Sequence, residues 1–237
     1  MQVLKRPGGE LASRPLHFIW IADCSGSMSG EKIQQLNFAI REAIPNMRVV
    51  ADENPNAEVL VRALKFSTGA QWHIASPTKI SEFEWKDLQA DGVTDMGKAL
   101  KMVADQMKMP PMSDRALPPV LVLFSDGQPT DDFNAGLQEL MALPWGKKAV
   151  RIAIAIGEDA DTDVLQQFMG ANSELKPLQA NNAQQLAKYI KWVSTAVLKA
   201  TSSPGSITEA MAKGSNVPLP ALPASDPATL NDVWDVF

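Results

Sequence analysis

The sequence has few of the residues on which several large classes of protein depend. Only one of its 237 residues is a cysteine, Cys24, so no disulfide can form within the chain and a disulfide-stapled secreted fold is excluded. Two histidines, His17 and His73, are too few for a zinc site built from Cys and His clusters. Both lie in strand-like apolar surroundings, which favours packed or surface side chains over membership of a Ser-His-Asp triad.

Excess positive charge and long apolar runs are also missing. The net charge is -5, so we expect no nucleic-acid partner. No apolar run approaches the ~20 residues that span a bilayer, and residues 1–22 do not follow the pattern of a secretory signal. Hydrophobic residues make up 45% of the chain, enough for a sizeable core. The composition therefore predicts a soluble, cytoplasmic protein without a membrane partner.

Short apolar runs alternate with amphipathic segments. The runs at 120–124 and 150–156 are apolar throughout, which is typical of strands buried on both faces. This alternation predicts an α/β fold: a doubly wound, mostly parallel sheet with one antiparallel edge strand and helices on both faces. We expect strands at 16–22, 57–67, 70–75, 120–124, 150–156 and 175–179, and helices at 32–51, 96–107, 131–143, 161–169 and 182–200.

Composition divides the chain into three parts. Residues 1–13 form an N-terminal extension, and residues 14–200 form the folded domain. Residues 201–237 contain five prolines and read as a flexible tail.

The end of the tail departs from this pattern. Asp226 and Pro227 favour a helix start, and an apolar stripe follows at helical spacing: Leu230, Val233, Trp234 and Phe237. A helix of about three turns is marginal alone in water. We therefore predict that this stripe binds a partner protein or another copy. The alternatives are a clasp on the chain's own domain and a disordered end.

Oxygen-bearing side chains follow three of the predicted strands or lie beside their ends. The loops are 23–27 (DCSGS), 91–97 (DGVTDMG) and 125–132 (SDGQPTDD). Ligands of such sheets bind at the carboxyl ends of the strands. Carboxylates and hydroxyls without nitrogen or sulfur ligands suit Mg²⁺ or Mn²⁺. The sequence thus predicts a site for a hard cation at this edge.

These three loops resemble the metal-ion-dependent adhesion site of von Willebrand factor type A domains, and the resemblance covers residues 14–198. It implies that Ser25, Ser27 and Thr94 approach the metal directly, and that Asp23 and Asp126 act directly or through water. Val93 stands where many relatives have Gly, and Ser125 where many have Thr. More narrowly, residues 125–132 resemble the bacterial TerY-type branch, which is linked to tellurium resistance and stress responses.

Neighbouring residues have simpler interpretations. Asp-x-Ser-Gly-Ser is also good turn chemistry. Asp95 reads as a solvated loop residue, with an accessory ligand as the alternative. Asp131 and Asp132 read as the start of the next helix, and Cys24 as a small buried residue.

The electrostatics favour a binding module over an enzyme. Hydroxyl ligands leave the metal electrophilic, so an acidic or phosphorylated group of a partner protein can complete its shell. By resemblance, the partners would be a Ser/Thr phosphatase and a Ser/Thr kinase. One alternative is a Mg²⁺-dependent phosphoryl-transfer enzyme, but a haloacid-dehalogenase-type site needs a second Asp where Ser25 stands. The other is a structural domain with an unused metal site. We predict no catalytic residues.

Overall fold

The computed structural model describes residues 13–54, 56–170, 173 and 175–202. The predicted tail motif of Leu230, Val233, Trp234 and Phe237 lies outside the described residues, as do residues 1–12. Among the described residues, no helix has both the length and the apolar character needed to cross a bilayer.

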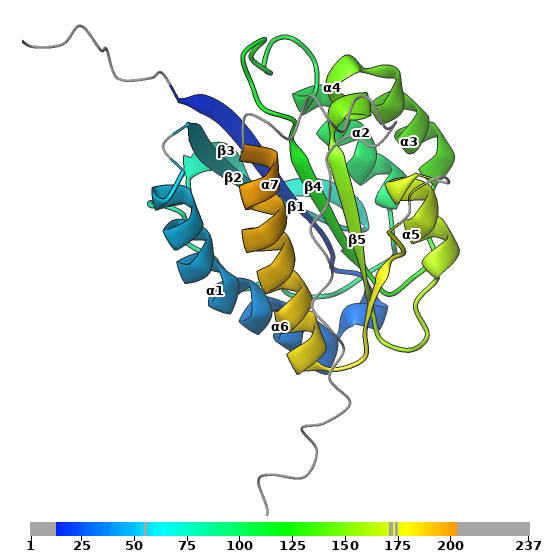
Figure 1. The fold of residues 1–237 in the computed structure, drawn as a ribbon. Helices are drawn as coiled ribbons and strands as arrows, with labels where there is room; N and C mark the ends of the chain where they lie inside the picture. The colour runs from blue at the N-terminus through cyan, green and yellow to red at the C-terminus, as the bar shows by residue number, and fades with distance from the viewer. Residues whose placement is uncertain (1–12, 55, 171–172, 174, 203–237) are drawn as a thin grey trace, which may run out of the picture.

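A six-stranded sheet forms the middle layer, in the order β3-β2-β1-β4-β5-β6 (Figure 1). β3 runs antiparallel to β2, and the other neighbouring strands are parallel. The predicted fold class is therefore confirmed. The strands are β1 (Arg14–Asp23), β2 (Ala57–Ser67), β3 (Gly69–Lys79), β4 (Val120–Ser125), β5 (Val150–Ile156) and β6 (Leu178–Ala180).

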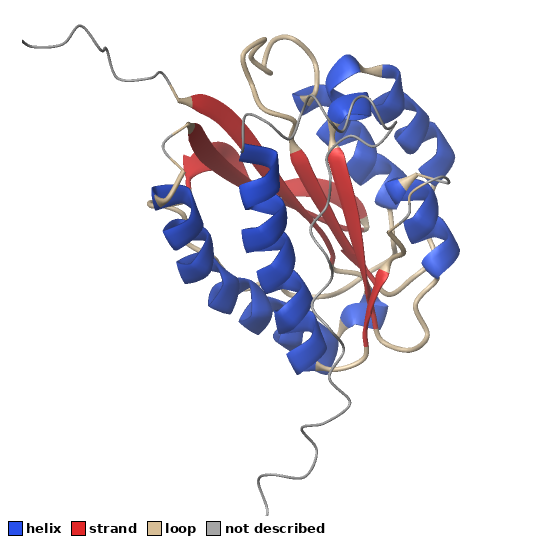
Figure 2. Cartoon of the chain, in the orientation of Figure 1, coloured by secondary structure: helices blue, strands red, loops and turns tan. Residues whose placement is uncertain are grey.

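Helices cover both faces of the sheet (Figure 2). One face carries α1 (Glu31–Asp52), α6 (Ala183–Trp192), a π-helical segment (Val193–Val197) and α7 (Leu198–Ser202). The other carries α2 (Met96–Gln106), α3 (Phe133–Ala142), α4 (Pro144–Lys148) and α5 (Thr162–Met169). A short 3₁₀ turn, η1 (Gly26–Met28), joins β1 to α1.

The two faces of the sheet bury separate apolar cores. On the α1 side, Trp20 meets Phe18, Phe83 and Trp85 edge-on, with ring centroids 5.5–5.9 Å apart. On the α2 side, Ile19 and Ile21 pack with Leu100 and Val103. Because β1 is buried on both faces, it has a near-continuous apolar sequence up to Asp23. The first polar side chains after this run therefore emerge at the edge of the sheet.

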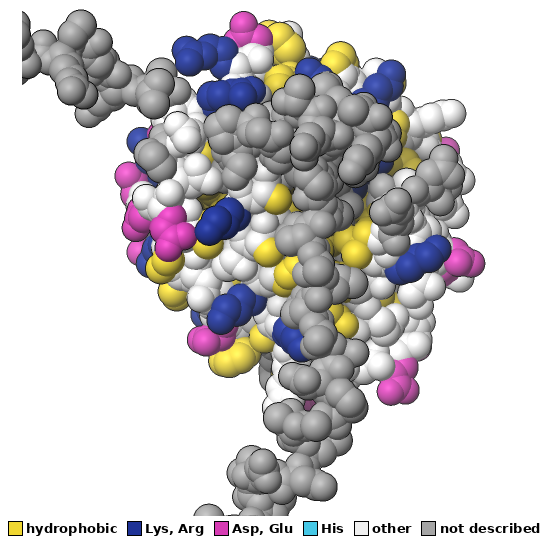
Figure 3. Space-filling model, in the orientation of Figure 1, with side chains coloured by type: hydrophobic (Ala, Val, Ile, Leu, Met, Phe, Trp, Pro, Cys, Tyr) yellow, Lys and Arg dark blue, Asp and Glu magenta, His cyan; other side chains and the backbone are white. Residues whose placement is uncertain are grey.

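Charges of both signs are interspersed on the face of the described chain that Figure 3 shows. On the face shown in Figure 3, Lys and Arg side chains lie among Asp and Glu side chains around the described part of the chain. That distribution differs from the single basic face typical of nucleic-acid-binding domains.

His17 lies on the α2 side of β1, close to Arg62 of β2. Burial, reinforced by the charge of Arg62, lowers the pKa of His17 from 6.5 to about 4. Protonation of His17 therefore favours the unfolded chain. The stability that the folded chain owes to a neutral His17 is fully present above about pH 6.5 and is lost as the pH falls towards 4.

Both proteins should become less stable when the pH is lowered from about 7 to about 4.5. We expect the free energy of unfolding to fall by about 1–2 kcal/mol less in His17→Gln than in the wild type, after allowance for partial solvent screening. Urea denaturation at the two pH values measures this difference. Equal losses in the two proteins would contradict the assigned pKa, because the carboxylates contribute to both alike.

Candidate metal site

Three loops meet at the carboxyl edge of the sheet and are fastened to one another by main-chain hydrogen bonds. Asp91 N donates to Cys24 O over 2.8 Å, and Gly26 N donates to Gly92 O over 2.9 Å. Thr130 N donates to Thr94 O, also over 2.9 Å. Loops far apart in the sequence are thus held in fixed positions around one small region.

Asp23 ends β1 and is fully buried. Its Oδ1 accepts the main-chain N–H of Ser25 over 2.8 Å, and its Oδ2 accepts the hydroxyl of Ser125 over 2.5 Å. Burial raises the pKa of Asp23, the charge of Asp126 adds to this effect, and the bonds from Ser125 and Ser25 oppose it. Ser125 therefore holds Asp23 in place and stabilises its charge.

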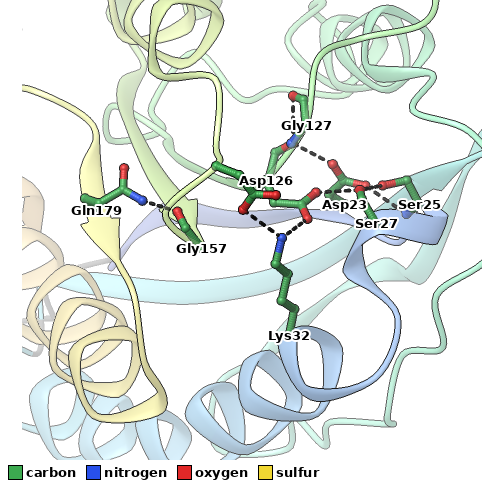
Figure 4. Close-up of polar contacts among 10 residues, drawn as sticks. Asp23, Ser25, Ser27, Lys32, Asp126, Gly127, Gly157 and Gln179 are labelled. Carbon is green, nitrogen blue, oxygen red and sulfur yellow. Dashed lines mark hydrogen bonds and ion pairs between the residues drawn. The ribbon is translucent and has the colours of Figure 1, made fainter.

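A chain of hydroxyls leads from Ser25 to Asp126 (Figure 4). Ser25 Oγ lies 3.0 Å from Ser27 Oγ, and Ser27 donates to Asp126 Oδ1 over 2.7 Å. Thr94 reaches the same region, because its hydroxyl and that of Ser27 lie near one point beside Gly127. A Cβ placed on Gly127 would be 3.7 Å from Ser27 Oγ and 3.8 Å from Thr94 Oγ1. The structure therefore brings all five predicted ligands to one edge of the sheet.

Lys32, in the first turn of α1, belongs to the same cluster, and the sequence analysis missed it. Its Nζ lies 2.5 Å from Asp126 Oδ2 (Figure 4) and 3.2 Å from Asp159 Oδ1. Burial alone would lower the pKa of Lys32, but the hydrogen bonds and charges of Asp126 and Asp159 outweigh it and raise the pKa. The cluster thus contains a fixed cation. The only sequence signal was the place of Lys32 two residues after Gly30, between the loop that begins at Asp23 and the helix that follows.

Asp95 is not the solvated residue that the sequence suggested, because only 6% of it is exposed. Its Oδ2 accepts from Lys98 Nζ over 2.6 Å and from Gly69 N over 2.7 Å, and both bonds lower its pKa. Asp95 therefore ties the β2–β3 turn to the start of α2. Its neighbour Thr94 is positioned by this bracing.

Asp131 and Asp132 serve two different helices. Asp132 is the N-cap of α3, as expected, and accepts from Ala135 N. Asp131 instead accepts from Gly97 N and Lys98 N, each over 2.8 Å, in the first turn of α2. The expectation that both aspartates start the next helix was therefore wrong for Asp131, which ties the third loop to the second.

Cys24 is a small buried residue, as predicted. Burial, with Asp23 nearby, raises the pKa of its thiol to about 12. Reactive cysteines have the opposite environment, one that stabilises the thiolate.

The donor chemistry of the cluster fits a hard divalent cation. Among the described residues, no three His, Cys, Asp or Glu side chains converge on a possible metal position. A metal here would thus depend on the hydroxyls of Ser25, Ser27 and Thr94 together with the two carboxylates. Oxygen donors of this kind are those that Mg²⁺ and Mn²⁺ prefer.

Comparisons with known proteins agree with this architecture. The model of the family described as von Willebrand factor type A domain matches residues 19–192. None of the curated proteins matches the chain.

Several solved structures share the fold. They include the ArnB paralog VWA2 from Sulfolobus acidocaldarius, with a TM-score of 0.55 and 22% identity over 75% of this chain and 44% of that one. Proximal thread matrix protein 1 from the mussel byssus, with a zinc-occupied adhesion-site motif, has a TM-score of 0.58 and 18% identity over 81% and 50%. The pilus adhesin SpaC from Lactobacillus rhamnosus GG has a TM-score of 0.62 and 14% identity over 80% and 31%. The chain thus spans half or less of each of these three structures.

Proposed function

Because the chain belongs to the von Willebrand factor type A domain family, we propose that it is a metal-dependent protein-interaction module that binds an acidic or phosphorylated group of a partner. The observation that carries this proposal is the convergence of three hydroxyls and two buried carboxylates at the edge of the sheet. The proposed ligands are Asp23, Ser25, Ser27, Thr94 and Asp126.

The charge of the cluster supports an anionic ligand. Asp23 and Asp126 supply two negative charges, and Lys32 offsets one of them. Asp159, the second partner of Lys32, is exposed and screened by water, so the buried groups together with a divalent cation would carry a net positive charge. A carboxylate or phosphate from a partner would neutralise that charge.

We propose Mg²⁺ or Mn²⁺ as the cation, because the donors are all oxygens. The mussel protein with zinc in its motif supports a divalent metal at this position of the fold. When bound, the metal would supply an electrophilic coordination position for the partner's oxygen. The chain's own residues hold that position, with Ser125 orienting Asp23 and Asp95 bracing the start of α2.

Phosphoryl transfer is less well supported. The side chain of Ser25 contacts the Ser27 hydroxyl and the Asp23 carboxylate, but the two oxygens of Asp23 already accept Ser25 N and Ser125 Oγ, so Asp23 is an anchor of the loop and not a free base. We expect no metal-dependent turnover of a generic phosphoester. Turnover that is lost in Ser25→Ala would favour an enzyme instead.

The resemblance of residues 125–132 to the TerY-type branch supports a narrower proposal. The module would act in the cytoplasm within a bacterial stress or tellurite-resistance system, with a Ser/Thr phosphatase and a Ser/Thr kinase as partners. The tail motif of Leu230, Val233, Trp234 and Phe237 would provide a second contact. Capture of those enzymes from the native host should require Mg²⁺ and weaken when residues 203–237 are deleted.

A calorimetric titration tests the main proposal. Mn²⁺ should bind about tenfold more tightly when an aspartate- or phosphoserine-containing peptide is present, since metal and anion complete one coordination shell. A peptide with asparagine or serine at the same position is the matched control. Mn²⁺ affinity that does not change with the acidic peptides would count against an anion-binding module.

Lys32 provides a separate prediction. Lys32→Met removes a positive charge 2.5 Å from Asp126, so Mn²⁺ should bind at least about fivefold more tightly than to the wild type. The coupling between metal and phosphoserine peptide should weaken at the same time. Lys101→Met, which alters an exposed lysine of α2, is the control. Unchanged or weaker Mn²⁺ binding in Lys32→Met would show that the lysine does not act on the metal.

A further inference from the structure

A fourth loop, residues 157–161, lies beside the candidate metal site and holds Lys32. The loop joins β5 to α5 and begins at Gly157, which has a positive φ of 92°. Gly157 N donates to Ala180 O over 2.9 Å, and Gly157 O accepts from the side chain of Gln179 (Figure 4). The start of the loop is thus fastened to the end of β6.

Lys32 packs closely against this loop. A Cβ added to Gly157 would lie 2.9 Å from Cε and 3.0 Å from Nζ of Lys32, so the bare glycine leaves the room that the lysine occupies. Two residues further along, Asp159 Oδ1 accepts from Nζ over 3.2 Å. The amino group is therefore held between the loop and Asp126, whereas most surface lysines extend into water.

Lys32 lies beside the proposed metal ligands and is not one of them. Its Nζ donates to Asp126 Oδ2 over 2.5 Å, while Asp126 Oδ1 accepts from Ser27 over 2.7 Å. Asp126 thus turns one oxygen toward another proposed ligand and the other toward the lysine. A metal bound by the five proposed ligands would leave Lys32 as a second cation next to it.

The amino group of Lys32 has room for another acceptor. An ammonium group has three donors, and among the described residues Nζ is hydrogen-bonded to Asp126 and Asp159. A quarter of the Lys32 side chain is exposed, and the side chain of Asp159 is 76% exposed. Exposed ion pairs of this kind are weak. An incoming anion can therefore bond to the third donor or take the place of Asp159.

A phosphate monoester makes better use of two neighbouring cations than a carboxylate does. Near pH 7 it carries close to two negative charges and three acceptor oxygens, whereas a carboxylate carries one charge and two oxygens. With one oxygen on the metal, a phosphate keeps two oxygens that can reach the lysine. Its second charge is also attracted by the ammonium group.

We propose that Lys32, held by the loop at 157–161, makes the site selective for a phosphorylated side chain of the partner over an aspartate or glutamate. This inference rests on the proposed function, because it requires a metal bound at the cluster. Asp159 reduces the selectivity, since its carboxylate competes for Lys32 and repels an approaching phosphate.

Calorimetric titration of the full chain with Mn²⁺ tests the selectivity. The titration is made without peptide, with Gly-Gly-Asp-Gly-Gly and with Gly-Gly-phosphoserine-Gly-Gly. The phosphoserine peptide should increase Mn²⁺ affinity at least about fourfold more than the aspartate peptide does. This advantage should fall by at least about half in Lys32→Met and persist in Lys101→Met, which alters an exposed lysine of α2. Since both peptides are compared on the same protein, a change in metal affinity alone cancels.

A second variant covers the case in which Lys32→Met does not fold. Asp159→Asn keeps Lys32 and all five proposed ligands but removes the competing carboxylate, so it should increase the phosphoserine advantage about twofold. Asp163→Asn, which alters an exposed carboxylate in the first turn of α5, is the matched control and should leave the advantage unchanged.

The outcomes separate this inference from the proposed function. If neither peptide tightens Mn²⁺ binding, the proposed function fails and the selectivity falls with it. If both tighten it equally, the proposed function stands and the selectivity is wrong. An advantage that is unchanged in Lys32→Met would belong to the metal alone, and an advantage unchanged in Asp159→Asn would contradict the competition for Lys32.

Discussion

Replacing Asp126 with alanine should weaken Mn²⁺ binding by at least about 100-fold while leaving the chain folded. Asp126 accepts from Ser27 on one oxygen and from Lys32 on the other, so its loss removes a proposed ligand and the partner of both neighbours. Lys32 would then retain only the exposed Asp159 as a partner, and its charge beside the metal position would no longer be offset by a buried carboxylate. Both effects act against a divalent cation.

Calorimetry with Mn²⁺ measures the loss, and circular dichroism confirms that the variant is folded. Asp105→Ala, which removes an exposed carboxylate from the far end of α2, is the matched control and should bind as the wild type does. Wild-type affinity in Asp126→Ala would remove this residue from the site.

The second large effect concerns the contact between α2 and α3. A Cβ on Gly97 would lie 2.3 Å from Asp132 O and 2.6 Å from Asp132 C, both of them main-chain atoms that cannot turn aside. We expect Gly97→Ala to destabilise the fold by about 3 kcal/mol, which lowers the midpoint of unfolding by about 6–12 °C. The shift of α2 would also disturb the bonds from Gly97 and Lys98 to Asp131.

Gly127→Ala is the control for this prediction. Its Cβ would have only ordinary contacts, at 3.7 Å and 3.8 Å, so we expect a loss below about 1 kcal/mol. Urea denaturation of the two variants gives the comparison. Similar stabilities would mean that the close approach of the two helices can be relieved at little cost.

The architecture could be predicted from the sequence because its signals are local. β5 (Val150–Ile156) is apolar throughout and has the predicted bounds. β2 (Ala57–Ser67) also has the predicted bounds, and β3, its antiparallel neighbour, follows after one residue. The three oxygen-rich loops could be found because they follow predicted strands or lie beside their ends, and the five candidate ligands within them were implied by the resemblance of these loops to a known adhesion-site motif.

The remaining parts of the site depend on contacts between distant segments. Lys32 and Asp126 are 94 residues apart, and nothing local distinguishes Lys32 from any other charged residue at a helix start. Asp131 and Asp132 are adjacent and equally suited to cap α3 by local rules, yet Asp131 caps α2 because the third loop crosses its first turn. Asp95 is buried against the β2–β3 turn, where its carboxylate accepts from Gly69 N, 26 residues earlier in the chain.

An anomalous difference map from a crystal grown with Mn²⁺ tests the central claim most directly. We predict one strong peak at the carboxyl edge of the sheet, about 2.1–2.2 Å from Ser25 Oγ, Ser27 Oγ and Thr94 Oγ1 and beside Asp126. The peak should disappear in crystals of Asp126→Ala. A map without a peak at this edge, or with its only peak on carboxylates elsewhere, would contradict the account.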